Sequence, residues 1–374
     1  ALVLFVFGTG PIKGFATTLL IGIMTSLFTA IFITRMLVEN HISKSKLLNF
    51  STSLTKNWLS NIGISFLIKR RISYVVSGTF IIIGLSSLFI NGLNQGVDFV
   101  GGRSYVVRFE QPVSQEKIQS NLIKVLGNAE VKTFGSDNQL KITTNYKVDT
   151  DSSDIDDEIN NILYTDLIEF MPENIAYEDF VVNGDENKQA GIMSSIKVGP
   201  TIADDIKKNS FYAVFGSLII VFLYILLRFK NWQFSLGAVS AVFHDVLVVL
   251  GIFSLTYSFM PFNMEINQAF IAAVLTVIGY SLNDTVVVFD RIREYRNINT
   301  SWELPRVVDS ALNSTLSRTL NTSFTTLVVL ISIFVFGGES IRGFMFALIV
   351  GVLIGTYSSV FVATPVMYDT LKNK

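Results

Sequence analysis

Residues 268–289 read QAFIAAVLTVIGYSLNDTVVVF, and Asp284 is the only charged residue among them. About 20 mostly apolar residues are enough for a helix to cross the hydrocarbon layer of a membrane. A carboxyl group inside such a helix is costly unless it faces the protein interior or a water-filled cavity. The stretch therefore predicts a membrane helix that carries one functional carboxyl group inside the bilayer.

Similar stretches lie on both sides of this one. The chain has 374 residues, of which 50% are hydrophobic and only 16% charged, and its mean hydropathy is +0.48. Residues 234–257 contain a single acid, Asp245, next to His244. Further stretches without any charged residue are 14–34, 72–97, 209–227, 319–338 and 343–368. Together they predict an α-helical membrane bundle with seven spans, and residues 1–7 are expected to end an eighth helix.

Composition excludes several other classes of protein. The net charge of −1 and the pI near 6.2 argue against a nucleic-acid partner. The chain has no cysteine, which excludes disulfides, thiolate catalysis and cysteine-ligated zinc. Its only histidines are His41 and His244, so a histidine-rich metal site is not expected either. We therefore expect no metal, no cofactor and no enzymatic activity.

The basic residues of the short loops predict the orientation. Loops at one end of the bundle, together with the C-terminus, hold fifteen lysines and arginines, whereas the opposite short loops hold only Lys13 and Arg342. Basic loops are retained in the cytoplasm. We therefore expect a cytoplasmic C-terminus and an exterior location for residues 98–208.

Residues 98–208 have the composition and periodicity of a separate domain. They contain 20 acidic and 11 basic residues. Alternating apolar residues predict strands at 99–109, 129–134 and 139–144, and helical spacing predicts helices at 114–126 and 154–171. Residues 177–182 and 192–198 are expected to supply the closing strand, so the order is strand, helix, strand, strand, helix and strand. This order is that of a ferredoxin-like α+β (βαββαβ) domain. We interpret the acidic run at 149–154 as a solvated loop and helix cap rather than a calcium site.

The two ends of the chain resemble each other without a gap. Residues 4–33 and 333–362 are identical at ten of thirty positions, including the pairs Gly14/Gly343 and Phe15/Phe344. Such repeats are common in membrane transporters. The first residues are therefore expected to be the final hairpin of an upstream half that is homologous to the rest.

Asp284 and Arg318 are predicted to lie at similar depth in neighbouring antiparallel helices. Arg318 belongs to a polar stripe with helical spacing that is expected to face the bundle: Ser314, Arg318, Asn321, Thr322 and Thr325. A carboxylate and a guanidinium inside the membrane suit a proton relay. The alternative is a static ion pair that locks the two helices together.

Other polar residues are candidates for relay or support roles around this pair: Asn283, Asn321, Thr322, Asp245 and His244. The segment GLNQGVDFVGG at 92–102 is interpreted as turns that join a span to a strand. Its turn residues are Gly92, Gly96, Asp98, Gly101 and Gly102. Residues 297–310 are expected to form a cytoplasmic helix on the membrane surface.

Several of these segments resemble one known family, SecD/SecF. The SecF signature segments are similar to GLNQGVDFVGG at 92–102, VFHDV at 242–246, GYSLNDTVVVFDRIRE at 279–294, SRTLNTSFTTL at 317–327 and FGGESIRGF at 336–344. Residues 7–35 resemble the closing hairpin of SecD. Val100 stands where SecF usually has threonine, a departure that leaves the role of the motif intact.

The resemblance implies a fused SecD–SecF arrangement in an RND-type membrane bundle. It divides the chain into residues 1–38 (last SecD-like hairpin), 39–70 (cytoplasmic linker), 71–97 (first SecF-like span), 98–200 (periplasmic ferredoxin-like domain) and 201–374 (five-helix SecF-like bundle). Asp284 matches the proton-carrying aspartate of the family, and Arg318 matches its neighbouring arginine.

The implied function is that of an accessory subunit of the bacterial Sec translocon, in the inner membrane, that uses the proton motive force to promote preprotein export. Implied partners are the SecYEG channel, SecA, YajC and YidC, the unfolded preprotein and membrane lipid. Two alternatives stay open. One is an RND-type exporter of small molecules or lipids, and the other is a structural stabiliser of the translocon that does not depend on protons.

Overall fold

The computed structural model describes residues 2–7, 10–44, 63–150, 153–173, 175–182 and 188–372. In this part of the chain, seven helices are long and apolar enough to cross a membrane. They are Lys13–Ser43, Leu67–Ile90, Pro200–Phe229, Trp232–Thr256, Gln268–Ile298, Leu304–Phe336 and Ile341–Leu371. The expected helical membrane bundle is therefore confirmed.

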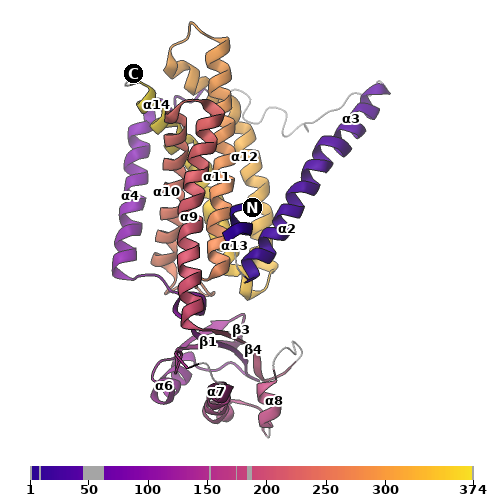
Figure 1. Ribbon diagram of the computed structural model, residues 1–374, viewed down its shortest axis with the longest axis vertical. Coiled ribbons are helices and arrows are strands. Elements are labelled where there is room, and N and C mark those ends of the chain that lie inside the picture. Colours follow the sequence, from indigo (N-terminus) through magenta and orange to yellow (C-terminus); the bar gives the residue numbers. More distant parts are fainter. Residues whose placement is uncertain are drawn as a thin grey trace.

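Most of these helices run side by side in a bundle with its small domain at one end (Figure 1). The bundle consists of α4 (Arg70–Ile90), α9 (Pro200–Phe229), α10 (Trp232–Thr256), α11 (Gln268–Ile298), α12 (Leu304–Phe336), α13 (Glu339–Ser358) and α14 (Thr364–Lys372). A short 3₁₀ turn, Leu67–Lys69, precedes α4, and the π-helical segment Ser359–Ala363 joins α13 to α14. Because α10 packs against α4, α9, α11 and α13, most of its side chains are buried.

Glycines allow the closest contacts between these helices. A Cβ atom on Gly251 of α10 would lie 2.5 Å from the Cα of Gly84 in α4. One on Gly237 would lie 2.5 Å from a backbone carbonyl of the π-helical segment, and one on Gly351 of α13 would lie 2.0 Å from the Val277 side chain of α11. Small residues let membrane helices approach closely, so that dispersion and hydrogen bonds hold them together. Glycines therefore bring α10 close to α4 and to the π-helical segment, and α13 close to α11.

The N-terminal repeat unit has the same local structure as its C-terminal copy. It comprises α1 (Leu2–Phe7), α2 (Gly10–Phe28), the π-helical segment Thr29–Ile33 and α3 (Thr34–Ser43). A π-helical turn thus interrupts both copies at corresponding places. The equivalent residues Phe15 and Phe344 contact each other edge to face, with ring centroids 5.6 Å apart. The shared π-helical turn supports the interpretation of the two ends of the chain as a repeat. Most of the predicted linker lies outside the described residues.

The small domain, residues 101–199, is a four-stranded antiparallel sheet with helices on one face. Its elements are β1 (Gly102–Arg108), α6 (Gln115–Leu126), β2 (Glu130–Phe134), β3 (Ser136–Thr144), α7 (Ser153–Leu167), the 3₁₀ turn Ile168–Phe170, α8 (Tyr177–Val181) and β4 (Gly191–Val198). The strand order is β2-β3-β1-β4. Apolar side chains of α6 and α7, such as Leu122 and Leu163, share one buried core with Val107 and Ile142 of the sheet. The other face of the sheet is turned toward the bundle (Figure 1).

The order of strands and long helices in the small domain agrees with the sequence prediction, and its grouping with ferredoxin-like folds stays a prediction. Two local assignments were wrong. Residues 177–181 form the helix α8 rather than a strand, and its first turn holds the acids Glu178 and Asp179, which favour a helix N-terminus. Residues 99 and 100, predicted as the start of the first strand, belong instead to the helical turn α5 (Val97–Val100), again with an acid, Asp98, in its first turn.

The predicted surface helix at residues 297–310 is also wrong. Helix α11 continues to Ile298, and α12 begins at Leu304 after a short turn. Pro305 lies in the first turn of α12, where its missing N–H needs no partner. The two helices therefore extend past the rest of the bundle as a hairpin, at the end opposite the small domain (Figure 1).

One ion-pair cluster predicts how the small domain responds to acid. The buried Arg103 side chain places its Nε 2.5 Å from Asp156 Oδ1, and Lys197 Nζ lies 3.0 Å from Oδ2. Burial raises the pKa of Asp156, but the hydrogen bonds and charges of Arg103 and Lys197 outweigh it and hold the pKa below its usual 3.8. A carboxyl with a depressed pKa stabilises the fold above its unfolded pKa, and this contribution is lost as the pH falls through the folded pKa.

We expect the urea midpoint of the small domain, followed by NMR methyl signals of its core, to fall as the pH drops from about 5 to below about 4. In Asp156→Asn the midpoint should be lower at neutral pH, since Arg103 is left buried without its anion at a cost of about 1–3 kcal/mol. In this variant the urea midpoint should depend much less on pH between about 5 and about 4 than in the wild type. An equally steep acid response in wild type and variant would show that other carboxyls control it.

Candidate intramembrane polar site

Asp284 is fully buried on α11, and neither of its carboxylate oxygens has a hydrogen-bond partner among the described residues. Its only charged neighbour there is Arg318 of α12, whose Nη1 lies 3.9 Å from Asp284 Oδ1. This distance is longer than a hydrogen bond. The guanidinium side chain is 49% exposed. The structure thus brings the two predicted residues together, in an arrangement too loose for a locked ion pair.

The polar stripe of α12 is only partly directed at the bundle: Arg318 reaches Asp284, and Ser314 accepts a hydrogen bond from Arg291 of α11 at 3.0 Å. Ser314, Arg318, Asn321 and Thr325 are exposed. The buried face of α12 is instead formed by smaller residues: Ala311, Thr315, Thr319 and Ser323. Small side chains let α12 lie close to α11 and α13, whereas a stripe with arginine and asparagine would keep these helices apart. Helical spacing identified a continuous stripe, but the side that packs was decided by size.

The support candidates Asn283, Asn321 and Thr322 make no hydrogen bond to Asp284 in the described part of the chain. Asn283 and Asn321 are exposed, and the Thr322 hydroxyl donates to the carbonyl of Arg318 at 3.0 Å. Each of the three therefore stays a prediction without a contact to the carboxyl group.

His244 and Asp245 lie in a second buried cluster, in the middle of α10. His244 Nδ1 lies 3.0 Å from Asp245 Oδ1. The Ser281 hydroxyl of α11 and the Ser358 hydroxyl of α13 donate to Asp245 Oδ2 at 2.6 and 2.7 Å. Beside this cluster, the Thr285 hydroxyl donates to Ser359 Oγ at 3.0 Å. The cluster connects three helices through one carboxylate.

The serines of this cluster were not identified from the sequence. Ser281 and Thr285 are spaced i, i+4, and Ser358 and Ser359 are adjacent serines in an uncharged stretch. That spacing was the available signal, because residues four apart lie on one face of a helix. In the described residues there is no group of three or more histidine, aspartate or glutamate side chains that could hold a metal.

The turn motif ties the small domain to the start of α11. Asp98 Oδ2 accepts a hydrogen bond from the backbone N–H of Gln268 at 2.9 Å. The backbone N–H of Gly96 donates to the carbonyl of Ile266 at 2.9 Å, and that of Ile266 donates to Asn94 at 2.7 Å. The motif is thus more than a connection between a span and a strand, because it is bonded to the helix that carries Asp284.

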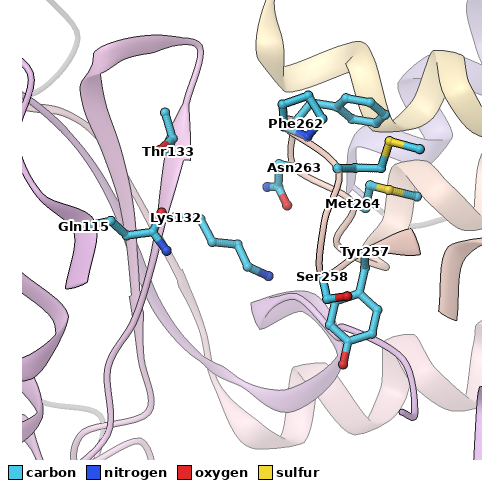
Figure 2. A pocket seen from close by; sticks show the side chains of 10 residues that line it. Gln115, Lys132, Thr133, Tyr257, Ser258, Phe262, Asn263 and Met264 are labelled. Carbon is cyan, nitrogen blue, oxygen red and sulfur yellow. The ribbon is translucent and has the colours of Figure 1, made fainter. Parts of the chain in front are cut away.

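A buried ion pair makes a second connection at the same place. Lys141 of β3 contacts Glu265, which lies just before α11, and the two side chains are 14% and 5% exposed. Next to it, a pocket of about 200 Å³ lies between the small domain and residues 257–264. Figure 2 shows Lys132 of the small domain reaching toward this loop, and its Nζ lies 5.8 Å from the ring centroid of Tyr257. The small domain therefore contacts the bundle through charged side chains beside the pocket.

These features define a multi-pass membrane protein with ionisable groups inside its helix bundle and a small α/β domain bonded to the start of one of those helices. The sequence model described as "Protein export membrane protein SecD/SecF, C-terminal" matches residues 180–373, and that of the "SecD/SecF GG Motif" matches residues 86–113. The chain belongs to the SecD/SecF family of protein-export membrane proteins, and it is SecF-like with a SecD-like hairpin in front.

Individual relatives agree with this assignment. The chain is 44% identical over 310 residues to the protein translocase subunit SecF of Rhodothermus marinus, which covers 83% of this chain and 94% of that protein. It is 34% identical over 372 residues to the protein translocase subunit SecDF of Brucella abortus, which covers 98% of this chain but 45% of that protein. The crystal structure of SecDF, a translocon-associated membrane protein from Thermus thermophilus, superposes with a TM-score of 0.82 at 27% identity, over 100% of this chain and 46% of that one. The chain thus spans nearly all of a SecF protein and slightly less than half of a SecDF protein.

Proposed function

We propose that this chain is part of an accessory subunit of the Sec protein translocase that couples proton flow to preprotein export. Membership of the SecD/SecF family supports the translocase assignment. The observation that carries the coupling is the buried Asp284, which has no hydrogen-bond partner in the described residues and lies 3.9 Å from Arg318. An unpaired carboxyl group inside a membrane bundle is a default candidate for a proton site.

In the proposed cycle a proton binds a carboxylate oxygen of Asp284 from one side of the membrane and leaves to the other. Protonation removes the negative charge, so the attraction to the Arg318 guanidinium is lost and α11 and α12 can shift relative to each other. The bonds from Asp98 to Gln268 and from Lys141 to Glu265 would pass a shift of α11 to the small domain. Proton binding would thereby move a domain outside the membrane.

The available energy suits this task. One charge that crosses 100 mV releases about 2.3 kcal/mol. This is enough to bias a domain movement but not to unfold a client domain with a stability of about 5–15 kcal/mol. The proposed action is therefore on a chain that is already unfolded, whose backsliding it would prevent.

We place the protein in the bacterial inner membrane, with the small domain in the periplasm and the C-terminus in the cytoplasm. The fifteen-to-two excess of basic residues in the loops at the end opposite the small domain supports this orientation. The proposed partners are the SecYEG channel, SecA, YajC and YidC, together with the preprotein and membrane lipid.

The test uses proteoliposomes that contain the intact protein together with the channel and a preprotein arrested partway through. Completion of export should accelerate when a proton gradient is imposed and return to the basal rate when an ionophore collapses it. Equal rates with and without the gradient would favour a structural stabiliser. Gradient-driven efflux of small molecules without any effect on the preprotein would favour an exporter.

The Lys141–Glu265 contact gives a separate prediction about coupling to the small domain. Lys141→Glu should remove most gradient-driven export, since two acids would then face each other at a buried position, and breaking a buried pair costs roughly 3–5 kcal/mol. The double variant Lys141→Glu/Glu265→Lys should recover much of the activity. The matched control is Lys147→Glu, which breaks the exposed pair with Glu158. Exposed pairs contribute at most about 1 kcal/mol, so this control should export normally. Failure of the charge swap to recover any activity would argue against the contact.

A further inference from the structure

Asp245 is fully buried where three helices meet, and its carboxylate is satisfied by its neighbours. It contacts His244 through Oδ1 and accepts hydrogen bonds from Ser281 and Ser358 through Oδ2. By contrast, Asp284 lies three residues after Ser281 on α11, about 4.5 Å along the helix axis, and has no such partners in the described residues. The cluster therefore fixes α11 nearly one turn before the carboxyl group that is proposed to carry the proton.

A second layer of contacts connects the same turn of α11 to the π-helical segment after α13. The Ser359 hydroxyl donates to the Gly355 carbonyl of its own helix at 2.9 Å and accepts from Thr285 of α11 at 3.0 Å, and the Ser281 carbonyl lies 3.3 Å away. The Thr364 hydroxyl donates to the carbonyl of Ser359, five residues earlier, at 3.0 Å. Segments of π-helix are often found at functional sites, where they alter the register of a helix locally. At the start of this segment Ser358 donates to Asp245, and the next residue, Ser359, accepts from Thr285.

We infer that Asp245, held by His244, is a positioning residue for Asp284: through Ser281 and Ser358 it sets where α11 lies against the π-helical segment, and thereby the surroundings of the proton site. The inference rests on the proposed role of Asp284. Apolar side chains could pack these helices at no lower stability, because a buried carboxylate carries a desolvation cost that its partners only offset. The carboxylate of Asp245 is hydrogen-bonded, whereas that of Asp284, about one turn away, has no hydrogen-bond partner in the described residues. This contrast indicates that Asp245 helps to position Asp284.

Few other charged or titratable groups face this region. Arg318 approaches Asp284 from α12, and the Tyr357 ring of α13 lies 6.2 Å from the ring of His244. The apolar stretches of α9 and α2 at residues 209–227 and 14–28 contain no charged residue. In α14, Asp369 is bonded to Arg70 and Tyr74 of α4 instead.

The test follows the protonation of Asp284 itself, by infrared spectroscopy of the intact protein in lipid. The C=O band of the protonated carboxyl is assigned by its absence in Asp284→Asn and is followed from pH 4 to 9. In Ser281→Ala and in Asp245→Asn, the midpoint of this band should shift by at least about half a pH unit, since the surroundings of Asp284 change. The control is Ser254→Ala, which removes another buried serine of α10, bonded to the Gly92 carbonyl at 2.7 Å and to Ser87 at 3.0 Å. Its midpoint should equal that of the wild type.

Ser281→Ala removes a single oxygen atom and keeps the test valid if Asp245→Asn does not fold. An unchanged midpoint in Ser281→Ala, in protein that is inserted and folded, would overturn the inference. The proposed function has a separate outcome: if Asp284→Asn supports normal gradient-driven export, the proton-carrier role fails, whatever the infrared midpoints show.

Discussion

Asp284→Asn is expected to abolish the gradient-dependent part of preprotein export and to leave the protein folded and inserted. Asparagine keeps the size and polarity of the side chain but cannot bind and release a proton. In the described residues no hydrogen bond to Asp284 exists that the substitution would break. Export should therefore fall to the rate measured without a gradient, in proteoliposomes with an imposed pH difference.

The same variant separates the relay from a static ion pair. If Asp284 and Arg318 locked two helices, losing one partner of a buried pair would destabilise the bundle by about 3–5 kcal/mol. The observed 3.9 Å separation and the 49% exposure of Arg318 predict instead a melting temperature equal to or above that of the wild type. The matched control is Asn297→Ala, which removes an exposed amide near the end of the same helix and should export normally. A clear drop in melting temperature together with normal export would support the static pair.

Gly102→Ser is expected to disrupt the small domain. Gly102 has φ +127°, a backbone conformation that other residues rarely adopt, and an added Cβ would lie 2.6 Å from the carbonyl oxygen of Thr144. That carbonyl belongs to β3, the strand that pairs with β1 next to Gly102. Backbone strain of this kind costs about 1–3 kcal/mol, and the clash adds to it. Rapid hydrogen exchange across β1 and β3, with loss of gradient-driven export, is the expected result.

Gly199→Ser provides the control at the other end of the small domain. Gly199 precedes α9 as its N-cap, and a Cβ added there has no atom within 4 Å. Serine is a favoured N-cap residue. This variant should therefore exchange and export like the wild type. Slow, native-like exchange of β1 in Gly102→Ser would contradict the role assigned to the turn glycine.

Much of the fold follows from the sequence because the membrane restricts the possible structures. Every backbone N–H and C=O in hydrocarbon must be bonded internally, so a long apolar stretch has to be a helix. Stretches such as 268–289 thus identified the spans directly. The strands and helices of the small domain were predicted from the periodicity of their apolar residues, except at residues 99–100 and 177–181, where acids in a short first turn favoured a helix.

The candidate site was only partly predictable. Asp284, Arg318, His244 and Asp245 are visible in the sequence, because ionisable groups are rare inside membrane spans. Serine and threonine are common there and give no such signal, so the partners of Asp245 were found only in the structure.

What the sequence by itself determined is therefore which segments cross the membrane and which ionisable residues they carry, since both depend on the cost of polar groups in lipid. Only the tertiary structure decided that Asp245 accepts hydrogen bonds from Ser281 and Ser358, whereas Asp284 has no hydrogen-bond partner in the described residues. It also decided that most side chains of the stripe with Arg318 are exposed. These outcomes depend on which helices approach one another and how closely. Small residues such as Gly351 and Gly355 control that approach, and their effect appears only when both helices are in place.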